Sequence, residues 1–168
     1  MCQFNCIKTV VSGRLYWADS TLTDDMILSK FPNSTPSTVL IINCAEELQV
    51  QFNYCVSNLY MWDVMYQYTS FNKYFKLAAD SADYDFLDKF LFNYDYVQII
   101  VMCNKGMNRS GYILGVLLDK MGYDNVINKL RSIKPGCLFN ESETCLSLYI
   151  KEQVDRINSL RDRFADRY

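Results

Sequence analysis

The sequence VQIIVMCNKGMNRSGYILGVLL, residues 97–118, decides the fold. It opens with an unbroken apolar run over residues 97–102, which predicts a strand buried on both faces. A short polar loop around Gly106 follows, and residues 108–121 predict an apolar helix. A buried strand that passes through a short loop into a helix is typical of an open α/β sheet, where ligands bind beyond the carboxyl ends of the strands. The loop is therefore the predicted functional site.

The residue types in this loop suit the binding of a tetrahedral anion. The N–H groups of a strand-to-helix loop, at the positive end of the helix dipole, favour a negative charge. Cys103 would lie at the floor of the loop, where the same field favours its thiolate form. Arg109 would offer a planar two-pronged fork to the anion, and Ser110 could donate a hydrogen bond to the thiolate and later help it to leave. Gly106 would permit a backbone conformation that a Cβ disfavours.

Strands and helices alternate along the rest of the chain. The other expected strands are a hairpin over residues 10–17 around Gly13, a fully buried strand at 38–43 and a shorter one at 56–62. The other expected helices are 70–92, 124–133, 142–160 and one that begins at Thr23 or Asp24 with Met26, Ile27 and Phe31 on its buried side. The pattern predicts an α/β fold in which helices flank a central, mainly parallel sheet. The 168 residues contain no repeat or linker and predict a single domain over 1–168, with a core of about 10–150 and a helical tail over 151–168.

Composition excludes several classes of chemistry. The chain has no histidine, which rules out Ser-His-Asp and Cys-His catalysis as well as His-based zinc sites. Its net charge of −2 is less basic than expected of a protein held on nucleic acid by phosphate contacts. The seven cysteines include no Cys-x-x-Cys pair, and no signal peptide or run of about 18 apolar residues occurs. We therefore expect free thiols in a reducing intracellular compartment, the cytoplasm or the nucleus, and no membrane span.

The loop Cys103-Asn-Lys-Gly106-Met-Asn-Arg109-Ser110 resembles the C-x-x-G-x-x-R-[ST] signature, a C-x5-R motif, of the cysteine-dependent phosphatases. The surroundings are similar to those of the compact dual-specificity branch, including its small viral members. The similar segments are Gly13-Arg-Leu-Tyr16, residues 39–47 (VLIINCAEE), Lys73-Tyr-Phe75, Lys134-Pro135 and Asn140. The resemblance covers roughly residues 10–150 and implies a single-domain cysteine-phosphatase fold.

The resemblance also implies a reaction. Phosphotyrosine and phosphoserine or phosphothreonine in proteins would be hydrolysed through a phosphocysteine on Cys103, with no metal or other cofactor. Ser110 would assist the thiolate. The phosphate would be bound by Arg109 and by the loop residues Asn104, Lys105, Gly106, Met107 and Asn108. Met102 stands where the family usually has a histidine, and this change predicts reduced activity because that histidine helps to keep the thiol ionised.

The family places an aspartic acid on a separate upstream loop to protonate the leaving oxygen. Asp63 is the preferred candidate because it follows a short predicted strand and precedes the helix expected at 70–92. Asp80 is the alternative, and a reaction without an acid residue is the third possibility.

Two other functions fit parts of the sequence. Residues 106–111 (GMNRSG) also resemble RNA 5′-triphosphatases, which can act without the aspartic acid, although the acidic net charge counts against RNA. Met102 is the main support for a weak or inactive phosphatase-like module that binds phosphorylated partners. The presence of both Cys103 and Arg109 argues against that module, since a pure binder has no need of a thiolate.

Overall fold

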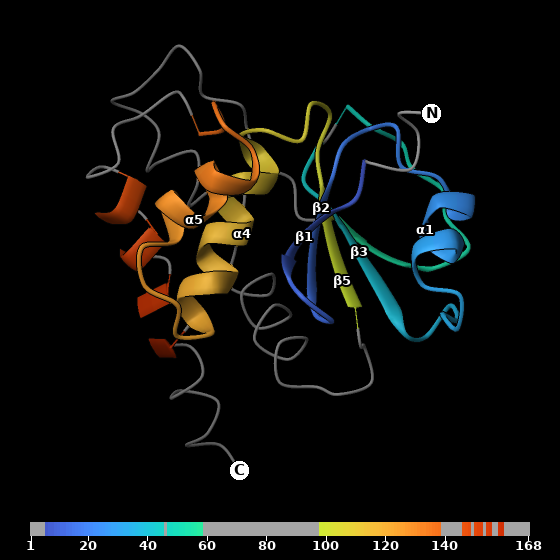
Figure 1. Ribbon diagram of the computed structural model, residues 1–168, viewed down its shortest axis with the longest axis horizontal. Coiled ribbons are helices and arrows are strands. Elements are labelled where there is room, and N and C mark those ends of the chain that lie inside the picture. The colour runs from blue at the N-terminus through green and yellow to red at the C-terminus, as the bar shows by residue number, and fades with distance from the viewer. Residues whose placement is uncertain are drawn as a thin grey trace.

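The computed structural model describes residues 6–45, 47–58, 98–138, 146–148, 150–152, 154–155 and 158–159. Five strands in this part of the chain form one sheet (Figure 1). The strands are β1 (Lys8–Val11), β2 (Leu15–Ala18), β3 (Val39–Asn43), β4 (Cys55–Asn58) and β5 (Gln98–Met102). Their order is β1-β2-β5-β3-β4, with β1 and β2 antiparallel and the other neighbours parallel. The mainly parallel sheet is as predicted.

Apolar side chains explain why β3 and β5 lie at the centre of the sheet. All five residues of β3 are buried, as are four of the five in β5. Side chains alternate between the two faces of a strand, so an unbroken apolar run can pack against layers on both sides. The sequence therefore specifies two apolar faces, and each is covered by a separate cluster of side chains.

Helix α1 (Asp24–Lys30) covers one face of the sheet, as Figure 1 shows. Thr23 is its N-cap, and the side-chain oxygen accepts a hydrogen bond from the Met26 amide, which satisfies one of the open donors of the first turn. Met26 and Ile27 are buried and pack with Ile41, Ile100 and Met102. Phe31, expected on the helix, is its C-cap and is half-buried.

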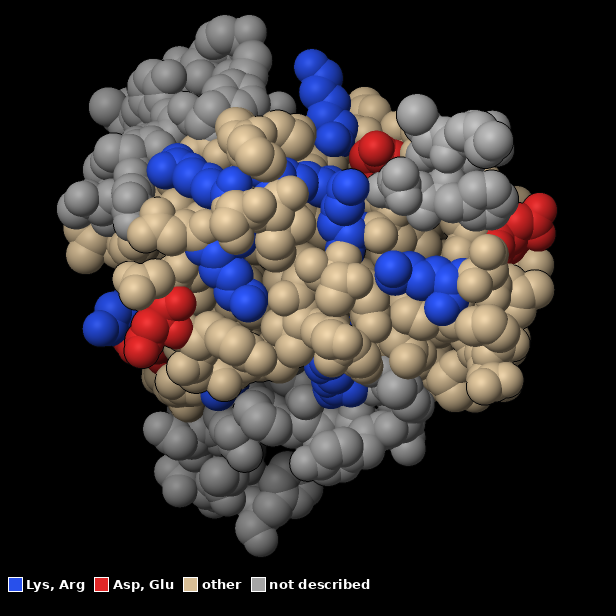
Figure 2. Space-filling view, in the orientation of Figure 1, with Lys and Arg blue, Asp and Glu red and all other residues tan. Residues whose placement is uncertain are grey.

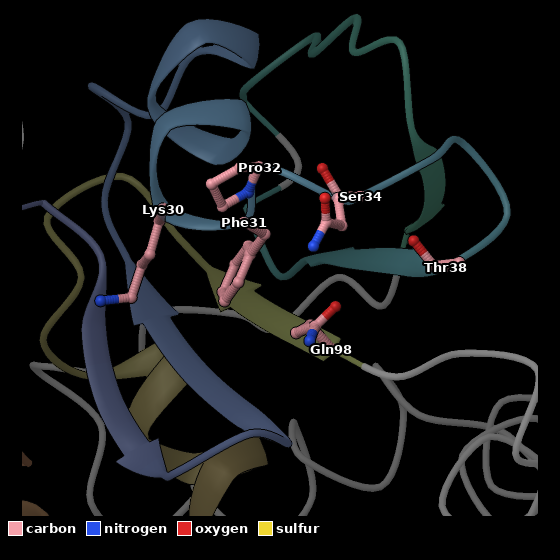
Figure 3. Close-up of a pocket in the computed structure, with 7 residues that line it drawn as sticks. Lys30, Phe31, Pro32, Ser34, Thr38 and Gln98 are labelled. Carbon is pink, nitrogen blue, oxygen red and sulfur yellow. The ribbon is translucent and has the colours of Figure 1, made fainter.

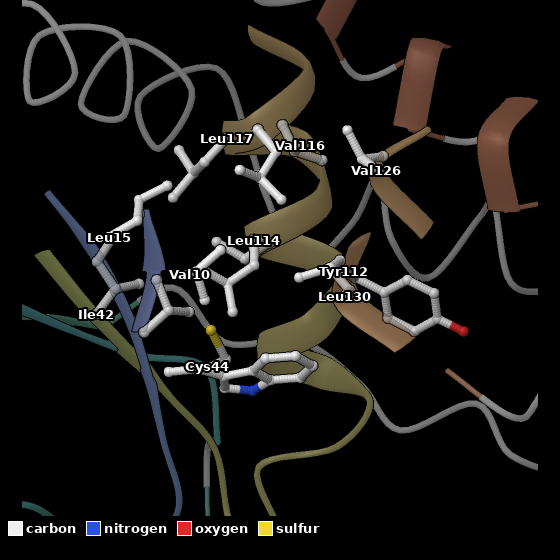
Figure 4. Packing of buried hydrophobic residues seen from close by; sticks show 14 of the residues in the cluster. Val10, Leu15, Ile42, Cys44, Tyr112, Leu114, Val116, Leu117, Val126 and Leu130 are labelled. Atoms are coloured by element: carbon white, nitrogen blue, oxygen red, sulfur yellow. The ribbon is translucent and has the colours of Figure 1, made fainter. Parts of the chain in front are cut away.

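The opposite face carries the larger cluster, part of which Figure 4 shows. Helix α4 (Arg109–Lys120) packs on it with nine consecutive buried residues from Ser110 to Leu118, and α5 (Val126–Ile133) lies against α4. The described residues between 146 and 159 are helical and add Leu146, Ile150 and Val154 to this cluster. Among the helices described, none is long and apolar enough to cross a bilayer.

The predicted and observed boundaries differ by one or two residues at several ends. The helix expected at 108–121 spans 109–120, and the helix expected at 124–133 begins at Val126. The strand expected from 56 begins at Cys55, and its second half lies outside the described residues. The helix expected at 70–92 and both acid candidates, Asp63 and Asp80, also lie outside the described residues.

Candidate active site

The signature loop occupies residues 103–108, between the end of β5 and the start of α4. Because β5 lies between β2 and β3, the loop leaves the sheet where three parallel strands end side by side. Met102, the last residue of β5, pairs with Ala18 of β2 and Asn43 of β3. Segments that follow β2 and β3 therefore flank the loop, as the carboxyl-end rule for parallel sheets predicts.

Cys103, at the start of the loop, and Ser110, in the first turn of α4, lie next to one another. The Cys103 Sγ is 3.1 Å from the Ser110 Oγ, and both side chains are buried. Ser110 is in the first turn of α4, so the positive end of that helix faces the sulfur. A hydroxyl at this distance can donate a hydrogen bond to a thiolate, and this bond favours the charged sulfur.

The backbone of the loop is held by donors on its outer side. The carbonyl oxygen of Asn104 accepts a hydrogen bond from the Ser20 amide at 3.0 Å, and that of Met107 accepts one from the Leu138 amide at 3.4 Å. The carbonyl of Gly106 accepts a bond from the Lys134 Nζ at 2.9 Å. The N–H of a trans peptide points opposite to its carbonyl, so the amides of residues 105, 107 and 108 point away from these partners.

Gly106 has a positive φ of 64° and sits in a narrow space. A Cβ built there would lie 2.9 Å from the Lys134 Nζ and 3.0 Å from the Ala18 carbonyl oxygen. Both the backbone angle and the space favour glycine, as the sequence predicts.

Arg109 forms a bidentate ion pair with Glu47, which follows β3. Its two terminal nitrogens donate to the two carboxylate oxygens at 2.7 and 2.5 Å. The Arg109 side chain is 12% exposed and that of Glu47 is 46% exposed. The pair lowers the pKa of Glu47 to about 2, chiefly through the hydrogen bonds from Arg109. The charged carboxylate of Glu47 is therefore bound to the same guanidinium that is expected to bind the anion.

Cys44 is a second buried thiol close to the loop. It follows β3, and its amide donates to the Met102 carbonyl oxygen at 2.9 Å. Burial raises the pKa of Cys44 well above its usual value, and a negative charge on Cys103 raises it further. Cys44 is therefore held as a neutral thiol beside Cys103.

Met102 points into the cluster under α1, on the opposite face of the sheet from Cys103. It is 1% exposed and packs with apolar side chains, which include Ala18 and Ile27. The methionine is thus matched to an apolar pocket.

The structure places Cys103 beside Ser110, Gly106 at the tight turn of the loop, and Arg109 at the first position of α4. Lys105 is exposed, Asn104 and Met107 are half-buried, and Asn108 is buried. Sequence reasoning missed Glu47, Trp17, Lys134 and Cys44 as neighbours of the loop. Glu47, Cys44 and Lys134 lie in segments quoted for their resemblance, but no sequence pattern indicates which group each side chain meets.

A cavity of about 350 Å³ lies away from this loop (Figure 3). Its lining includes Phe31 and Pro32 after α1, Thr38 before β3 and Gln98 at the start of β5. These residues mark the amino ends of β3 and β5, whereas the signature loop follows the carboxyl end of β5. The cavity is therefore separate from the candidate active site.

Solved structures resemble this one over most of the chain. Human DUSP28 is 11% identical, with a TM-score of 0.61, and the match covers 91% of this chain and 95% of DUSP28. DUSP15 is 14% identical, with a TM-score of 0.61 and 96% of both chains covered. A mouse putative dual specificity phosphatase, solved with zinc tungstate, is 12% identical, with a TM-score of 0.59 and coverages of 92% and 89%.

The chain has the fold of the dual-specificity phosphatases. This finding confirms the fold class that the sequence predicts. No protein-family model and no curated protein matches the sequence. At 11 to 14% identity, the dual-specificity fold is what these structures share with the chain, and its chemistry has to follow from its own residues.

Proposed function

We propose that the protein is a cysteine-dependent phosphatase that hydrolyses phosphomonoesters on proteins, on phosphotyrosine and on phosphoserine or phosphothreonine. The observation that carries the proposal is the 3.1 Å approach of the Cys103 sulfur and the Ser110 hydroxyl, in a loop from which Arg109 begins the next helix. This arrangement offers a nucleophile, a hydrogen-bond donor for its charged form and a cation for a phosphoryl group.

In the first step the Cys103 thiolate attacks phosphorus. The S–P bond forms, the bond from phosphorus to the ester oxygen breaks, and that oxygen takes a proton as it leaves. Asp63 is the proposed donor of this proton, with Asp80 or water as the alternatives. Arg109 and the amides of residues 104–109 bind the remaining phosphoryl oxygens and stabilise the charge that develops on them.

In the second step water attacks the phosphocysteine. A new P–O bond forms, the S–P bond breaks, and its electron pair returns to the sulfur as a thiolate. The proton of the attacking water passes to the carboxylate left by the first step, or to solvent if no acid takes part. Ser110 stabilises the departing thiolate by donating a hydrogen bond to it.

Substrate binding has to accommodate Glu47 as well. A guanidinium carries five N–H groups, so Arg109 can in principle hold a carboxylate and a phosphoryl oxygen together or exchange one for the other. Either way, the Glu47 charge lies close to the incoming dianion and opposes it. We therefore expect Glu47 to weaken the binding of phosphate.

The surface charge supports an anionic substrate. In Figure 2, Lys and Arg side chains extend over the upper and middle parts of the visible face, with an acidic side chain beside the uppermost of them, and Figure 1 shows the loop between β5 and α4 in the upper part. A local excess of positive charge raises the concentration of anions near a site even when the net charge of the whole chain is −2.

Hydrolysis of an aryl phosphate tests the proposal. The protein should release phosphate, and Cys103→Ser should abolish the release because a serine hydroxyl stays protonated. Cys55→Ser, which changes an exposed cysteine on β4, is the matched control and should keep full activity. Arg109→Lys should lose at least tenfold in kcat/KM, since an ammonium cannot make the planar bidentate contact. Undiminished release by Cys103→Ser would refute the proposal.

A panel of substrates separates the proposed activity from its rivals. Release of phosphate from phosphotyrosine and phosphoserine peptides at rates that exceed those on RNA would support it. Faster removal of the γ-phosphate from triphosphate-ended RNA would indicate an RNA triphosphatase instead. Tight binding of phosphopeptides with no turnover would indicate a binding module.

A further inference from the structure

A tryptophan reaches the candidate nucleophile from behind the loop. The indole N–H of Trp17, on β2, donates a hydrogen bond of 2.7 Å to the Ser110 Oγ, which lies 3.1 Å from the Cys103 Sγ. Trp17 and Ser110 are fully buried and 93 positions apart in the sequence. The three side chains thus form a buried chain of contacts that ends at the sulfur.

The direction of these hydrogen bonds follows from the groups involved. An indole N–H can only donate, so Ser110 has to accept the bond from Trp17. A thiolate has no hydrogen, so the bond between Ser110 and a charged Cys103 has to run from the hydroxyl to the sulfur. Trp17 thereby occupies one lone pair of the serine oxygen while the single hydroxyl hydrogen faces Cys103. A hydroxyl that accepts one hydrogen bond also becomes a better donor in the next.

Lys134 contacts both the Trp17 ring and the backbone of the signature loop. Its Nζ lies 4.5 Å from the centroid of the Trp17 ring and donates to the Gly106 carbonyl oxygen at 2.9 Å. A cation over the face of an indole is attracted to the ring. Burial lowers the pKa of Lys134, and the negative charges of Asp19 and Cys103 oppose that shift. Lys134 therefore interacts with the ring, the loop backbone and the charge on the nucleophile.

We propose that Trp17 is a positioning residue that commits the hydroxyl proton of Ser110 to the Cys103 sulfur, and that Lys134 supports this arrangement through the indole face and the loop carbonyl. The inference rests on the proposed role of Cys103 as nucleophile. The hydrogen bond would act twice, once by favouring the thiolate before attack and once by stabilising it as the S–P bond breaks. Trp17 and Lys134 would thus help to stabilise the Cys103 thiolate, which Met102 cannot do in place of the usual histidine.

Other charged and titratable groups also face this part of the loop. Cys44 approaches from the end of β3 and stays neutral, and Arg109 on α4 is paired with Glu47. Asp19 acts on Lys134 from the segment after β2. Trp17→Phe leaves these described groups in place, removes the indole N–H and keeps an aromatic ring in the core, and it also makes the ring beneath Lys134 smaller.

The test measures alkylation of Cys103 by iodoacetamide against pH, with the modified Cys103 peptide read by mass spectrometry. Trp17→Phe should slow alkylation at neutral pH about fivefold, in line with the loss of part of one charge-assisted hydrogen bond, and should move the midpoint of the profile to higher pH. In a Ser110→Ala background the same substitution should change nothing further, because Trp17 acts through Ser110. An unchanged profile in Trp17→Phe, or an equal effect without Ser110, would overturn the inference.

Lysine variants provide a matched comparison. Lys134→Met should also slow alkylation of Cys103 at neutral pH. Lys129→Met is the control, since Lys129 stacks over Tyr123 at 5.2 Å on α5 and makes no described contact with the loop. Equal effects of the two variants would show that Lys134 acts only through general charge, and that part of the proposal would fail.

Two further measurements keep the test decisive. If Trp17→Phe fails to fold, a benzothienylalanine at position 17 keeps the shape of the side chain and removes only the N–H. On an aryl phosphate, Trp17→Phe should lower kcat more than kcat/KM, with accumulation of phosphocysteine, because departure of the thiolate slows most. Alkylation does not need turnover. A protein that hydrolyses nothing yet shows the predicted alkylation effects would refute the proposed function and leave the orienting role of Trp17 intact.

Discussion

Glu47 and Arg109 are 62 positions apart in the sequence, and their ion pair sets the charge beside the loop. The pKa of Glu47 lies near 2 because Arg109 hydrogen-bonds its charged form. A carboxyl group with a lowered pKa stabilises the fold above its ordinary value of 4.5, and this contribution is lost as the pH falls through about 2. Since the Glu47 side chain is 46% exposed, solvent screening keeps the contribution to folding small.

A titration of the Glu47 side-chain carboxyl by NMR checks this pair. The midpoint should lie near 2 in the wild-type protein and return toward 4.5 in Arg109→Met, where the guanidinium is gone. Arg14→Met, which removes a guanidinium from the turn between β1 and β2, should leave the midpoint near 2. A wild-type midpoint near 4.5 would show that the ion pair does not form in solution.

The candidate site residues that the sequence indicates most clearly lie in one continuous segment, residues 103–110, and their catalytic roles stay predictions. Cys103, Gly106, Arg109 and Ser110 have short, fixed spacings, and each spacing has a chemical reason. The partners of these residues could not be predicted in the same way. Trp17 is an apolar-strand residue by pattern, and its N–H meets Ser110 only because β2 lies beside β5 in the folded sheet.

At the scale of elements, the loop between β5 and α4 depends on glycine for its shape. Gly106→Ala should destabilise the protein by about 2–4 kcal/mol, since it combines a left-handed backbone with contacts of 3.0 Å or less to Lys134 and Ala18. Gly13→Ala is the control, because Gly13 also has a positive φ of 79° but has nothing within 4 Å of the added Cβ. Chemical denaturation measures both, and equal losses would contradict the steric argument.

A second glycine lets the C-terminal helical segment approach α4. A Cβ on Gly115 would lie 2.6 Å from the Ile150 Cδ1, so Gly115→Leu should cost about 1–3 kcal/mol by overpacking. Ile150→Ala alone should also destabilise, because it leaves a cavity in the core. Together the two changes should cost less than their sum, and strict additivity in thermal unfolding would show that these side chains do not meet.

The elements themselves were largely predictable, for physical reasons. The apolar side chains of β3 and β5 leave water only if both faces of each strand are covered. The Thr23 cap determines where α1 begins. The ends of the helices were less predictable, because the terminal residues of a helix fray and differ little in free energy between the helical and the non-helical conformation. Phe31 is an example. Its spacing predicted a position within α1, but the residue is the C-cap of the helix, and its ring packs edge-on against Tyr16.

For the whole molecule, the sequence predicts the class of fold but not the strand order. Continuous apolar strands separated by helices require a mainly parallel, covered sheet. No pattern states that β5 lies between β2 and β3, and this placement brings Trp17 and Glu47 to the loop. The sequence therefore does not predict those contacts of the candidate site that depend on the order of the strands in the sheet.

The C-terminal segment joins the main core and should be needed for stability. Leu146, Ile150 and Val154 are 0%, 2% and 7% exposed and belong to the cluster between the sheet and α4. Deletion of residues 146–168 removes these three described side chains, each worth about 1.5–3 kcal/mol, which together approach the whole stability of a typical domain. Thermal unfolding should show a large loss for this deletion and little loss for Leu148→Ala, because the Leu148 side chain is 64% exposed. A small effect of the deletion would contradict the assigned packing.

The most direct test of the central claim is to trap the intermediate. The protein is mixed with a labelled aryl phosphate and quenched in acid within milliseconds, and the digested peptides are then examined by mass spectrometry. The account predicts a phosphate on the peptide that contains Cys103, present in Cys55→Ser and absent in Cys103→Ser. Release of phosphate by the wild-type protein with no label on Cys103, together with undiminished turnover by Cys103→Ser, would contradict it.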